Sequence, residues 1–537
     1  MTKFYKAIGL FLLCFLFATC EFRKQRTYKI AERDTTITRE NAYSDLFLDT
    51  GNLTTFIEER EMHDSLANRM RSFYNKRNYQ FAWFFPQGMA EYVSTFLHMQ
   101  DQFIYYSNDS TLYLPGLKER VFTLIDLQQI DPNDPQIYET ELLLTYQFFR
   151  YAYYAYSGDR QVNLQDLDWF IPRKKLELEP FLDSLIAHQG ERIEEFEPVH
   201  PQYNLLKKYL LQYYDIHEHR EWPTLKPGKQ VLRLGDKDPV VPWVRKRLKL
   251  LGYLLDGEAD SLDMITPLLA KEVISFQKHY GLEEDGSLGP TFFAEINKTP
   301  KDRIRQLLIN MERIRWMPDH LNSDFILVNI PEYRLHVYEK GQHAYRMNVV
   351  VGAVAHRTVV FSDVVSQIVF SPYWNVPPSI VRNEILPALE KDSAYLDRNN
   401  MEWVGTTLRQ KPGPGNALGK VKFLFPNNYN IYLHDTPSKK LFESPHRAFS
   451  HGCIRIAEPQ KLAEFILRKD STWTKERIIE AMNAGIERVV RLRPEYRIPV
   501  VIGYFTAWVD SEGNLNFRRD IYGHDKRMAA RFLKNEK

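Results

Sequence analysis

The pattern of apolar residues changes near residue 317, and this change limits the folds open to the chain. Before it, apolar residues follow helical spacing, as in the amphipathic segment from Arg303 to Trp316. After it, short apolar or alternating runs at 325–330, 334–338 and 345–351 are separated by turn signals. The 537 residues suffice for three or four domains. We therefore expect a multidomain α+β protein that is mainly helical first and β-rich later.

Turn signals divide the chain further. A mainly helical region is expected over 21–228, and its sequence shows no metal-ligand spacing, phosphate loop or paired catalytic carboxylates. A polar, proline-containing linker at 221–228 ends it. The later segments are expected as a compact unit with three helices over 229–299, a linker helix over 300–318, a β-rich domain over 319–475, and a helix with a hairpin over 476–537.

Residues 381–420, inside the β-rich domain, lack a convincing strand pattern. The segment is charged at first and then rich in proline and glycine, notably in Lys411-Pro-Gly-Pro-Gly415. Long connections of this kind are more often functional than accidental. We expect a mobile lid.

The first 20 residues have the features of a secretory signal. Basic residues precede an apolar stretch of 13 residues, Ala7 to Thr19, which is too short to span a bilayer. Phe17-Ala-Thr-Cys20 resembles a loose lipobox, although Thr19 departs from its usual small residues. We expect lipidation at Cys20 and a membrane anchor at the amino terminus. Simple cleavage and an uncleaved anchor remain as alternatives.

Cysteine use indicates a reactive thiol. Of the three cysteines, Cys14 and Cys20 fall in or at the signal, so the mature chain keeps one free thiol, Cys453. A single thiol in an oxidising compartment excludes a structural disulfide. His434, 19 positions earlier, can supply the base that a thiol needs, and Gly452 leaves room for a substrate carbonyl near backbone N–H donors. The alternative is a small buried cysteine beside an unrelated histidine.

The segment 432–456, YLHDTPSKKLFESPHRAFSHGCIRI, resembles the active-site signature of the L,D-transpeptidases, which have a YkuD-like catalytic domain. The matching positions are His434, Ser450, Gly452, Cys453 and Arg455. Asp435 stands where many members have glycine. The resemblance implies a cysteine acyltransferase that takes an acyl group from a peptidoglycan stem peptide and passes it to an amine.

The resemblance extends to the flanking regions. Residues 73–83 are similar to the opening of the scaffold domain in the large L,D-transpeptidases, and 229–299 resembles a three-helix peptidoglycan-binding domain. In these relatives the segment matching 381–420 caps the active site. Trp374 then borders the substrate groove, unless burial alone explains it.

The resemblance also implies roles for side chains near Cys453. Tyr432 would add its hydroxyl to the oxyanion hole formed by backbone N–H groups of Gly452 and Cys453. Arg455 would bind a substrate carboxylate or fix the turn; otherwise it is a surface cation. His451 alternates with serine in the family and is expected to be auxiliary.

We therefore expect 3→3 cross-linking of peptidoglycan stem peptides in the cell envelope or periplasm, through a cysteinyl acyl-enzyme that carbapenems would also form. Partners are the stem peptides, the glycan and the membrane; the chain is expected to be monomeric and to need no metal or cofactor. A net charge of +2 gives no electrostatic footprint for nucleic acid. The alternatives are L,D-carboxypeptidase, hydrolase or protein-anchoring activity at the same site, or a non-catalytic wall-binding scaffold.

Overall fold

The computed structural model describes residues 29–107, 109–158, 163–174, 176–253, 257–317 and 323–532. The expected signal segment, with Cys14 and Cys20, lies outside these residues. The chain divides into two compact units, of which one ends at Ala155 and also includes Glu177–Pro198. The other contains Tyr156–Leu176 and everything from Val199 onward.

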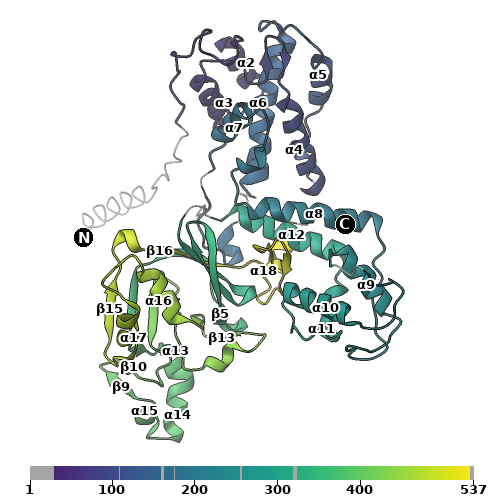
Figure 1. The fold of residues 1–537 in the computed structure, drawn as a ribbon. Coiled ribbons are helices and arrows are strands. Elements are labelled where there is room, and N and C mark those ends of the chain that lie inside the picture. Colours follow the sequence, from purple (N-terminus) through teal and green to yellow (C-terminus); the bar gives the residue numbers. More distant parts are fainter. Residues whose placement is uncertain are drawn as a thin grey trace, which may run out of the picture. The chain divides into compact units, whose positions relative to one another are not determined.

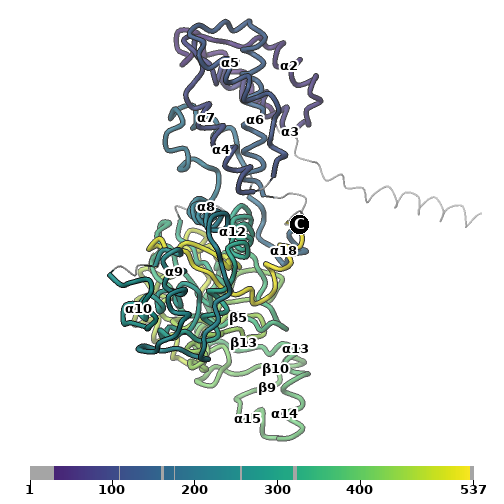
Figure 2. The backbone as a smooth tube through the Cα atoms, turned by 90° about the vertical axis from the view of Figure 1, so that its right-hand side faces the viewer, coloured from purple at the N-terminus to yellow at the C-terminus, as the bar shows by residue number. Residues whose placement is uncertain are grey.

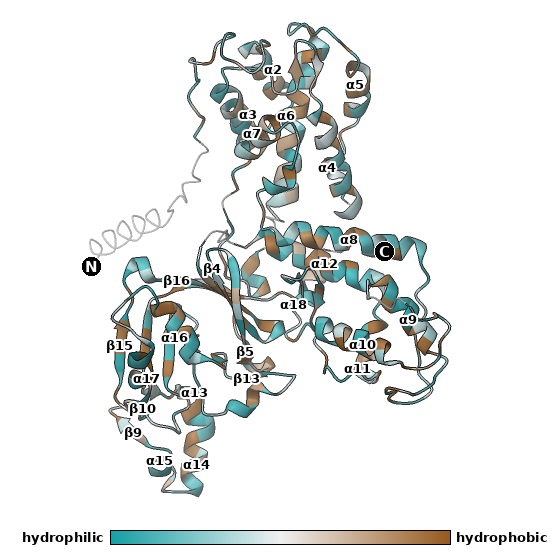
Figure 3. Cartoon of the chain, viewed as in Figure 1, coloured by the Kyte–Doolittle hydropathy of each residue, from teal (hydrophilic) through white to brown (hydrophobic). Residues whose placement is uncertain are grey.

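The first unit is mainly helical. Its elements are α2 (Thr50–Glu59), α3 (Asp64–Lys76), β1 (Phe84–Phe85), β2 (Gly88–Met89), α4 (Tyr92–Ser107), α5 (Leu117–Leu124), α6 (Pro135–Tyr156) and α7 (Glu179–Ala187). Figure 3 shows that apolar residues run along much of α6. Phe96 of α4 and Phe148 of α6 are fully buried with ring centroids 5.3 Å apart, so aromatic packing forms this core.

The second unit begins with helices. They are α8 (Gln202–His219), α9 (Val241–Leu250), α10 (Pro267–Tyr280), α11 (Pro290–Ile296) and α12 (Pro300–Arg315). The helices α9, α10 and α11 bury Leu248, Phe276 and Phe292, and the ring centroids of the two phenylalanines lie 5.0 Å apart. Helix α12 starts with a capping box between Thr299 and Asp302.

An eleven-stranded mixed sheet forms the β-rich domain. Its strands are β3 (Phe325–Asn329), β4 (Arg334–Glu339), β5 (Gln342–Gly352), β6 (Phe361–Val365), β7 (Gln367–Phe370), β11 (Val421–Leu424), β12 (Leu433–His434), β13 (Ala448–Ser450), β14 (Ile454–Ile456), β15 (Arg488–Arg491) and β16 (Ile498–Gly503). Their order is β15-β7-β11-β12-β14-β5-β4-β3-β16-β6, with β13 beside β5. Two helices, α16 (Pro459–Leu467) and α17 (Lys475–Asn483), follow β14 (Figure 1). The helical and β-rich regions thus confirm the expected α+β class.

The sheet extends beyond residue 475, where the sequence placed the end of this domain. Strand β16 pairs in parallel with β3 and antiparallel with β6, and β15 pairs with β7. The expected hairpin is shorter: β17 (Ala507–Val509) pairs with β18 (Leu515–Phe517), and helix α18 (His524–Phe532) follows. Period-two patterns indicate strands but do not identify their partners.

The insertion expected as a mobile lid without a convincing strand pattern contains short helices and two strands. It contains α13 (Pro378–Ile380), the π-helical turn η6 (Val381–Ile385), α14 (Leu386–Lys391), α15 (Tyr395–Arg398), β9 (Met401–Val404) and β10 (Thr407–Gln410). Strand β10 also pairs with β8 (Trp374–Asn375), which gives a separate three-stranded sheet. Figures 1 and 2 both show α14, α15, β9 and β10 gathered at one end of the β-rich domain.

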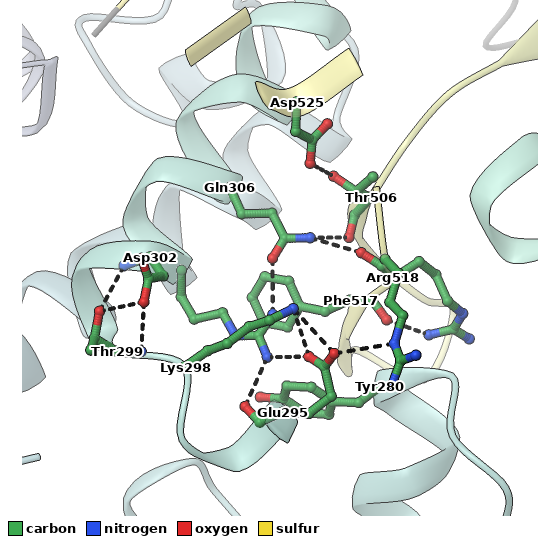
Figure 4. Close-up of polar contacts among 12 residues, drawn as sticks. Tyr280, Glu295, Lys298, Thr299, Asp302, Gln306, Thr506, Phe517, Arg518 and Asp525 are labelled. Atoms are coloured by element: carbon green, nitrogen blue, oxygen red, sulfur yellow. Dashed lines mark hydrogen bonds and ion pairs between the residues drawn. The ribbon is translucent and has the colours of Figure 1, made fainter. Parts of the chain in front are cut away.

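Partly buried polar contacts join α12 and the three-helix unit to the carboxy-terminal segment of the same compact unit (Figure 4). Gln306 of α12 donates from Nε2 to the carbonyl oxygens of Thr506 and Arg518, both at 3.0 Å. Arg518 in turn donates to the carbonyl oxygens of His279 at 2.7 Å and Lys278 at 3.3 Å. The end of α10 is therefore held against the segment that follows β18.

In the part of the chain that the structure describes, no helix combines the length and the apolarity that crossing a membrane requires.

Candidate functional site

A cavity of about 880 Å³ lies between the insertion and the strands β12 and β14. All the side-chain positions expected at the site line it except Gly452: they are Trp374, Tyr432, His434, Ser450, His451, Cys453 and Arg455. The sheet brings them together because β12 and β14 are parallel neighbours, with Leu433 opposite Ile454 and His434 opposite Arg455.

Cys453 follows β13 and directly precedes β14, and its side chain is half-buried. The Sγ–H group donates to the carbonyl oxygen of Asn430 at 3.3 Å. Burial raises the pKa of the thiol, although hydrogen bonds from Tyr432 and the charge of Arg455 oppose this rise. The thiol is therefore protonated at neutral pH, and its attack on a carbonyl requires a base.

His434 is buried at the end of β12, with 4% of its surface exposed. Its Nδ1 lies within hydrogen-bond distance of the carbonyl oxygen of Asp435, which can only accept, so Nδ1 carries the proton and Nε2 the lone pair. Burial and the neighbouring charge of Arg455 lower the pKa of His434 to about 4. The imidazole is thus neutral at neutral pH and able to take a proton at Nε2.

The turn from Ser450 to Cys453 is held by the Ser450 hydroxyl. Ser450 Oγ donates to the carbonyl oxygen of Cys453 at 2.5 Å and accepts from the backbone N–H of Gly452 at 3.2 Å. The N–H of Gly452, which was expected as an oxyanion donor, is therefore already hydrogen-bonded within the turn. The backbone N–H of Cys453, by contrast, has no acceptor among the described residues.

The backbone conformation at position 452 requires glycine. Its φ of 112° lies in a region that L-residues with a side chain rarely adopt. The glycine that the sequence motif contains thus shapes the turn and does not donate into the cavity.

Two polar groups flank the thiol. Tyr432 contacts Cys453, and burial together with that contact raises the pKa of the tyrosine, so its hydroxyl keeps its proton. Arg455 is half-buried, and its Nε is buried without a hydrogen-bond partner among the described residues. An unpaired donor of this kind, on a cation that lines a cavity, suits a carboxylate ligand.

The opposite wall of the cavity comes from the insertion. Trp374 is half-buried and packs on a small apolar core formed by Val376, Ile380, Ile385, Met401 and Leu408. It therefore both borders the cavity and contributes to packing. His451 is exposed, and its Nε2 lies 3.0 Å from Oε1 of Glu384 in η6, which gives a direct contact between the two walls.

A contact between the motif and the end of the insertion also supports the site and was not expected from the sequence. Asp435, noted only as a departure from the family, accepts the backbone N–H of Lys420 at 2.9 Å and pairs with Lys439. A Cβ on Gly419 would lie 2.4 Å from Asp435 Cγ, so this glycine is needed for the close approach. The carboxylate thereby fixes the end of the insertion. Neighbouring charged residues in the motif gave no signal of this long-range contact.

Family models match three regions of the chain. Residues 323–489 match the model described as "L,D-transpeptidase catalytic domain", residues 68–210 match "Scaffold domain", and residues 237–296 match "Putative peptidoglycan binding domain".

Relatives carry the same name. A protein of Haemophilus influenzae named "Putative L,D-transpeptidase" is 32% identical over 245 residues, which cover 42% of this chain and 49% of that protein. The chain thus aligns with about half the length of this curated relative. Among solved structures, an L,D-transpeptidase from Xylanimonas cellulosilytica is 15% identical, with 52% of this chain and all of that chain covered and a TM-score of 0.17.

L,D-transpeptidase 3 from Mycobacterium tuberculosis is 14% identical, with 34% of this chain and 61% of that chain covered and a TM-score of 0.19. Such low scores carry no weight beside the family models. The chain therefore contains an L,D-transpeptidase catalytic domain, preceded by a scaffold domain and a peptidoglycan-binding domain.

Proposed function

We propose that the protein is a cysteine L,D-transpeptidase that forms 3→3 cross-links between peptidoglycan stem peptides. The observation that carries the proposal is the convergence of three groups in one cavity: the Cys453 thiol, the neutral buried imidazole of His434, and the Arg455 guanidinium, whose Nε has no hydrogen-bond partner in the described part of the chain. Together they can supply a nucleophile, a base and a site for a carboxylate.

Acylation begins when the Cys453 thiol leaves the carbonyl of Asn430 and gives its proton to Nε2 of His434. Sγ then attacks the amide carbonyl between the third and fourth residues of a donor tetrapeptide. Because the pKa of the thiol is raised and that of His434 is lowered, the resting pair is neutral, and proton transfer accompanies the attack.

The tetrahedral intermediate carries negative charge on the former carbonyl oxygen. The N–H of Cys453 and the hydroxyl of Tyr432, which contacts Cys453, would stabilise this charge, each by an amount on the order of 3 kcal/mol in such sites. The C–N bond then breaks, and the terminal D-residue leaves with the proton from His434. A thioester on Cys453 remains.

Deacylation repeats the sequence with an acceptor amine. The side-chain amine of the acceptor's third residue attacks the thioester, its proton passes to His434, and the thiolate that leaves is reprotonated. Arg455 would bind a carboxylate of the donor stem. The diamino acid at the third position follows from the family resemblance. The reaction needs no cofactor under this proposal.

The domain set supports work in the cell envelope, where the binding domain would hold glycan or stems. Lipidation of Cys20, anchoring to a membrane and a monomeric state stay predictions.

Incubation of the purified protein with disaccharide tetrapeptides, followed by mass spectrometry, tests the proposal. A dimer that lacks one terminal D-residue supports transpeptidation. Tripeptide alone indicates a carboxypeptidase, and unchanged substrate indicates a wall-binding scaffold. A protein-anchoring acyltransferase would transfer the stem to an added lysine-containing peptide instead.

A further inference from the structure

Two residues outside the motif, Thr358 and Tyr522, support the turn that carries Cys453. Thr358 donates from Oγ1 to the carbonyl oxygen of Gly452 at 2.8 Å and accepts the backbone N–H of Gly352 at 2.9 Å. Tyr522 donates its hydroxyl to the carbonyl oxygen of Gly352 and accepts the N–H of Thr358 at 3.4 Å. All of these groups are buried, so water does not compete for the contacts.

The carbonyl that Thr358 holds and the N–H of Cys453 belong to one peptide group. Because a trans peptide is planar, its C=O and N–H point in opposite directions, and fixing one fixes the other. Glycine permits rotation of this peptide, since Gly452 has no Cβ and already has a φ of 112°. The Ser450 hydroxyl holds the two neighbouring peptide groups, through the N–H of Gly452 and the carbonyl of Cys453. The contact to Thr358 is the hydrogen bond that acts on this peptide directly.

Tyr522 is itself fixed by the carboxy-terminal segment. Its backbone N–H donates to the hydroxyl of Tyr504 at 2.9 Å, and that hydroxyl donates to Oδ1 of Asp520 at 2.7 Å. Burial raises the pKa of Tyr522 to about 12, so its hydroxyl remains a donor across the physiological range. Arg518, two residues before Asp520, takes part in the partly buried contacts of Figure 4. Hydrogen bonds within the carboxy-terminal segment therefore fix the position of Tyr522.

We propose that Thr358 and Tyr522 are positioning residues for the acyl transfer: they direct the backbone N–H of Cys453 toward the oxygen that becomes negative. The inference rests on the proposed function. Neither residue contacts the thiol, so their loss impairs reactions that form an oxyanion and spares reactions that do not. Donation to the Gly452 carbonyl also polarises the peptide and strengthens its N–H as a donor.

Two reagents separate these effects. A carbapenem acylates a cysteine when Sγ attacks the β-lactam carbonyl and the ring C–N bond opens with protonation of nitrogen, so an oxyanion forms. Iodoacetamide alkylates the same sulfur by displacement of iodide, and no oxyanion forms. Rates of both reactions are measured by intact mass on wild type, Thr358→Val, Thr358→Ser and Tyr522→Phe. Tyr345→Phe is the matched control, because its hydroxyl also donates to a backbone carbonyl, that of Lys461 at 3.3 Å.

In Thr358→Val we expect carbapenem acylation to slow about tenfold or more, in line with the cost of small misplacements in active sites, while alkylation stays within about twofold. Thr358→Ser should restore acylation, Tyr522→Phe should slow it less, and Tyr345→Phe should leave both rates unchanged. With peptide substrate, kcat should fall and KM should stay constant, because the oxyanion exists only in the transition state.

The inference is overturned if acylation is unchanged in both Thr358→Val and Tyr522→Phe, or if acylation and alkylation fall equally. Equal loss would mean that the variants only disturb the fold around the sulfur. If wild type itself is not acylated at Cys453, the proposed function fails first, and this outcome is distinct from the other two.

Discussion

The two walls of the cavity are built in different ways. On the sheet wall, His434 and Ser450 are buried, and each is tied to backbone groups of its own strand or turn. The insertion wall stands on its own three-stranded sheet and a five-residue apolar core, and it exposes Trp403 and Leu386. The groups suited to bond making lie on the first wall and the broad apolar surfaces on the second. We infer that the first performs chemistry and that the second retains substrate.

Replacing the nucleophile tests the sheet wall most severely. Cys453→Ala should reduce cross-linking and carbapenem acylation by at least about 10³-fold, since no other group can form the thioester. Binding to isolated peptidoglycan sacculi should persist, because the three-helix unit is untouched. Turnover in this variant, measured by mass spectrometry, would remove Cys453 from the mechanism.

Shortening the insertion tests the opposite wall. Replacement of residues 386–415 by a Gly-Ser linker removes α14, α15 and the β9–β10 hairpin. We expect cross-linking to fall on the order of 100-fold and the hydrolysed fraction to rise, because water reaches the thioester. Alkylation of Cys453 by iodoacetamide should continue. A parental rate with an unchanged hydrolysis ratio would reduce the insertion to a tolerated surface element.

The loss of activity at low pH tests whether His434, on the sheet wall, acts as a neutral base. The base must be neutral, and the pKa of His434 is lowered to about 4, so activity is present above this value and lost as pH falls through it. Carbapenem acylation should be level from pH 5 to 8 and fall about tenfold per unit below the pKa. His356→Gln, which changes an exposed histidine near the turn, should keep this profile. An inflection near 6.5, the ordinary value for histidine, would contradict the buried neutral base.

Substituting two glycines in turn compares the end of the insertion beside Asp435 with the turn between β9 and β10. Both have positive φ, 61° at Gly419 and 59° at Gly405, but a Cβ would strike Asp435 only at Gly419 and meets nothing within 4 Å at Gly405. Gly405→Ala should cost about 1 kcal/mol of unfolding free energy from backbone strain, and Gly419→Ala about 3 kcal/mol. Urea unfolding measures both. Equal losses would show that Asp435 does not fix this end of the insertion.

Loss of the contact between Glu384 and His451, which joins the two walls, should have the smallest effect on activity. Glu384→Gln removes the charge facing His451, but both side chains are about half exposed, and such pairs contribute about 0 to 1 kcal/mol. The hydrolysed fraction should rise less than about threefold. Glu390→Gln, on the exposed surface of α14, is the control. A tenfold change in Glu384→Gln alone would make this contact the main restraint on the insertion.

Local patterns explain which features could be predicted from sequence. The first strands of the sheet follow period-two apolar runs, and the motif around Cys453 placed His434 and Arg455 near the thiol. The insertion was expected as a loop because α15 has four residues and β9 and β10 have four each, too few for periodicity to be visible.

Long-range support could not be predicted in the same way. Thr358 meets Gly452 across 94 positions, and Tyr522 meets Gly352 across 170. Neither residue has an unusual neighbour in sequence, and their contacts follow from the pairing of strands far apart in the chain. The hydrogen bond from the N–H of Gly452 to the Ser450 hydroxyl could likewise not be predicted, because it depends on the conformation of the turn.

The hydrogen bonds from Arg518 to the end of α10 have a consequence for how the proposed transpeptidase would contact the cell wall. A binding domain joined by a flexible linker would allow the catalytic domain to reach every stem peptide within the length of that linker. Because the three-helix unit is hydrogen-bonded to the carboxy-terminal segment, it would present the cavity to a bound glycan strand at one fixed angle. Which stems could then be joined would depend on the helical pitch of that strand and on the spacing of its neighbours.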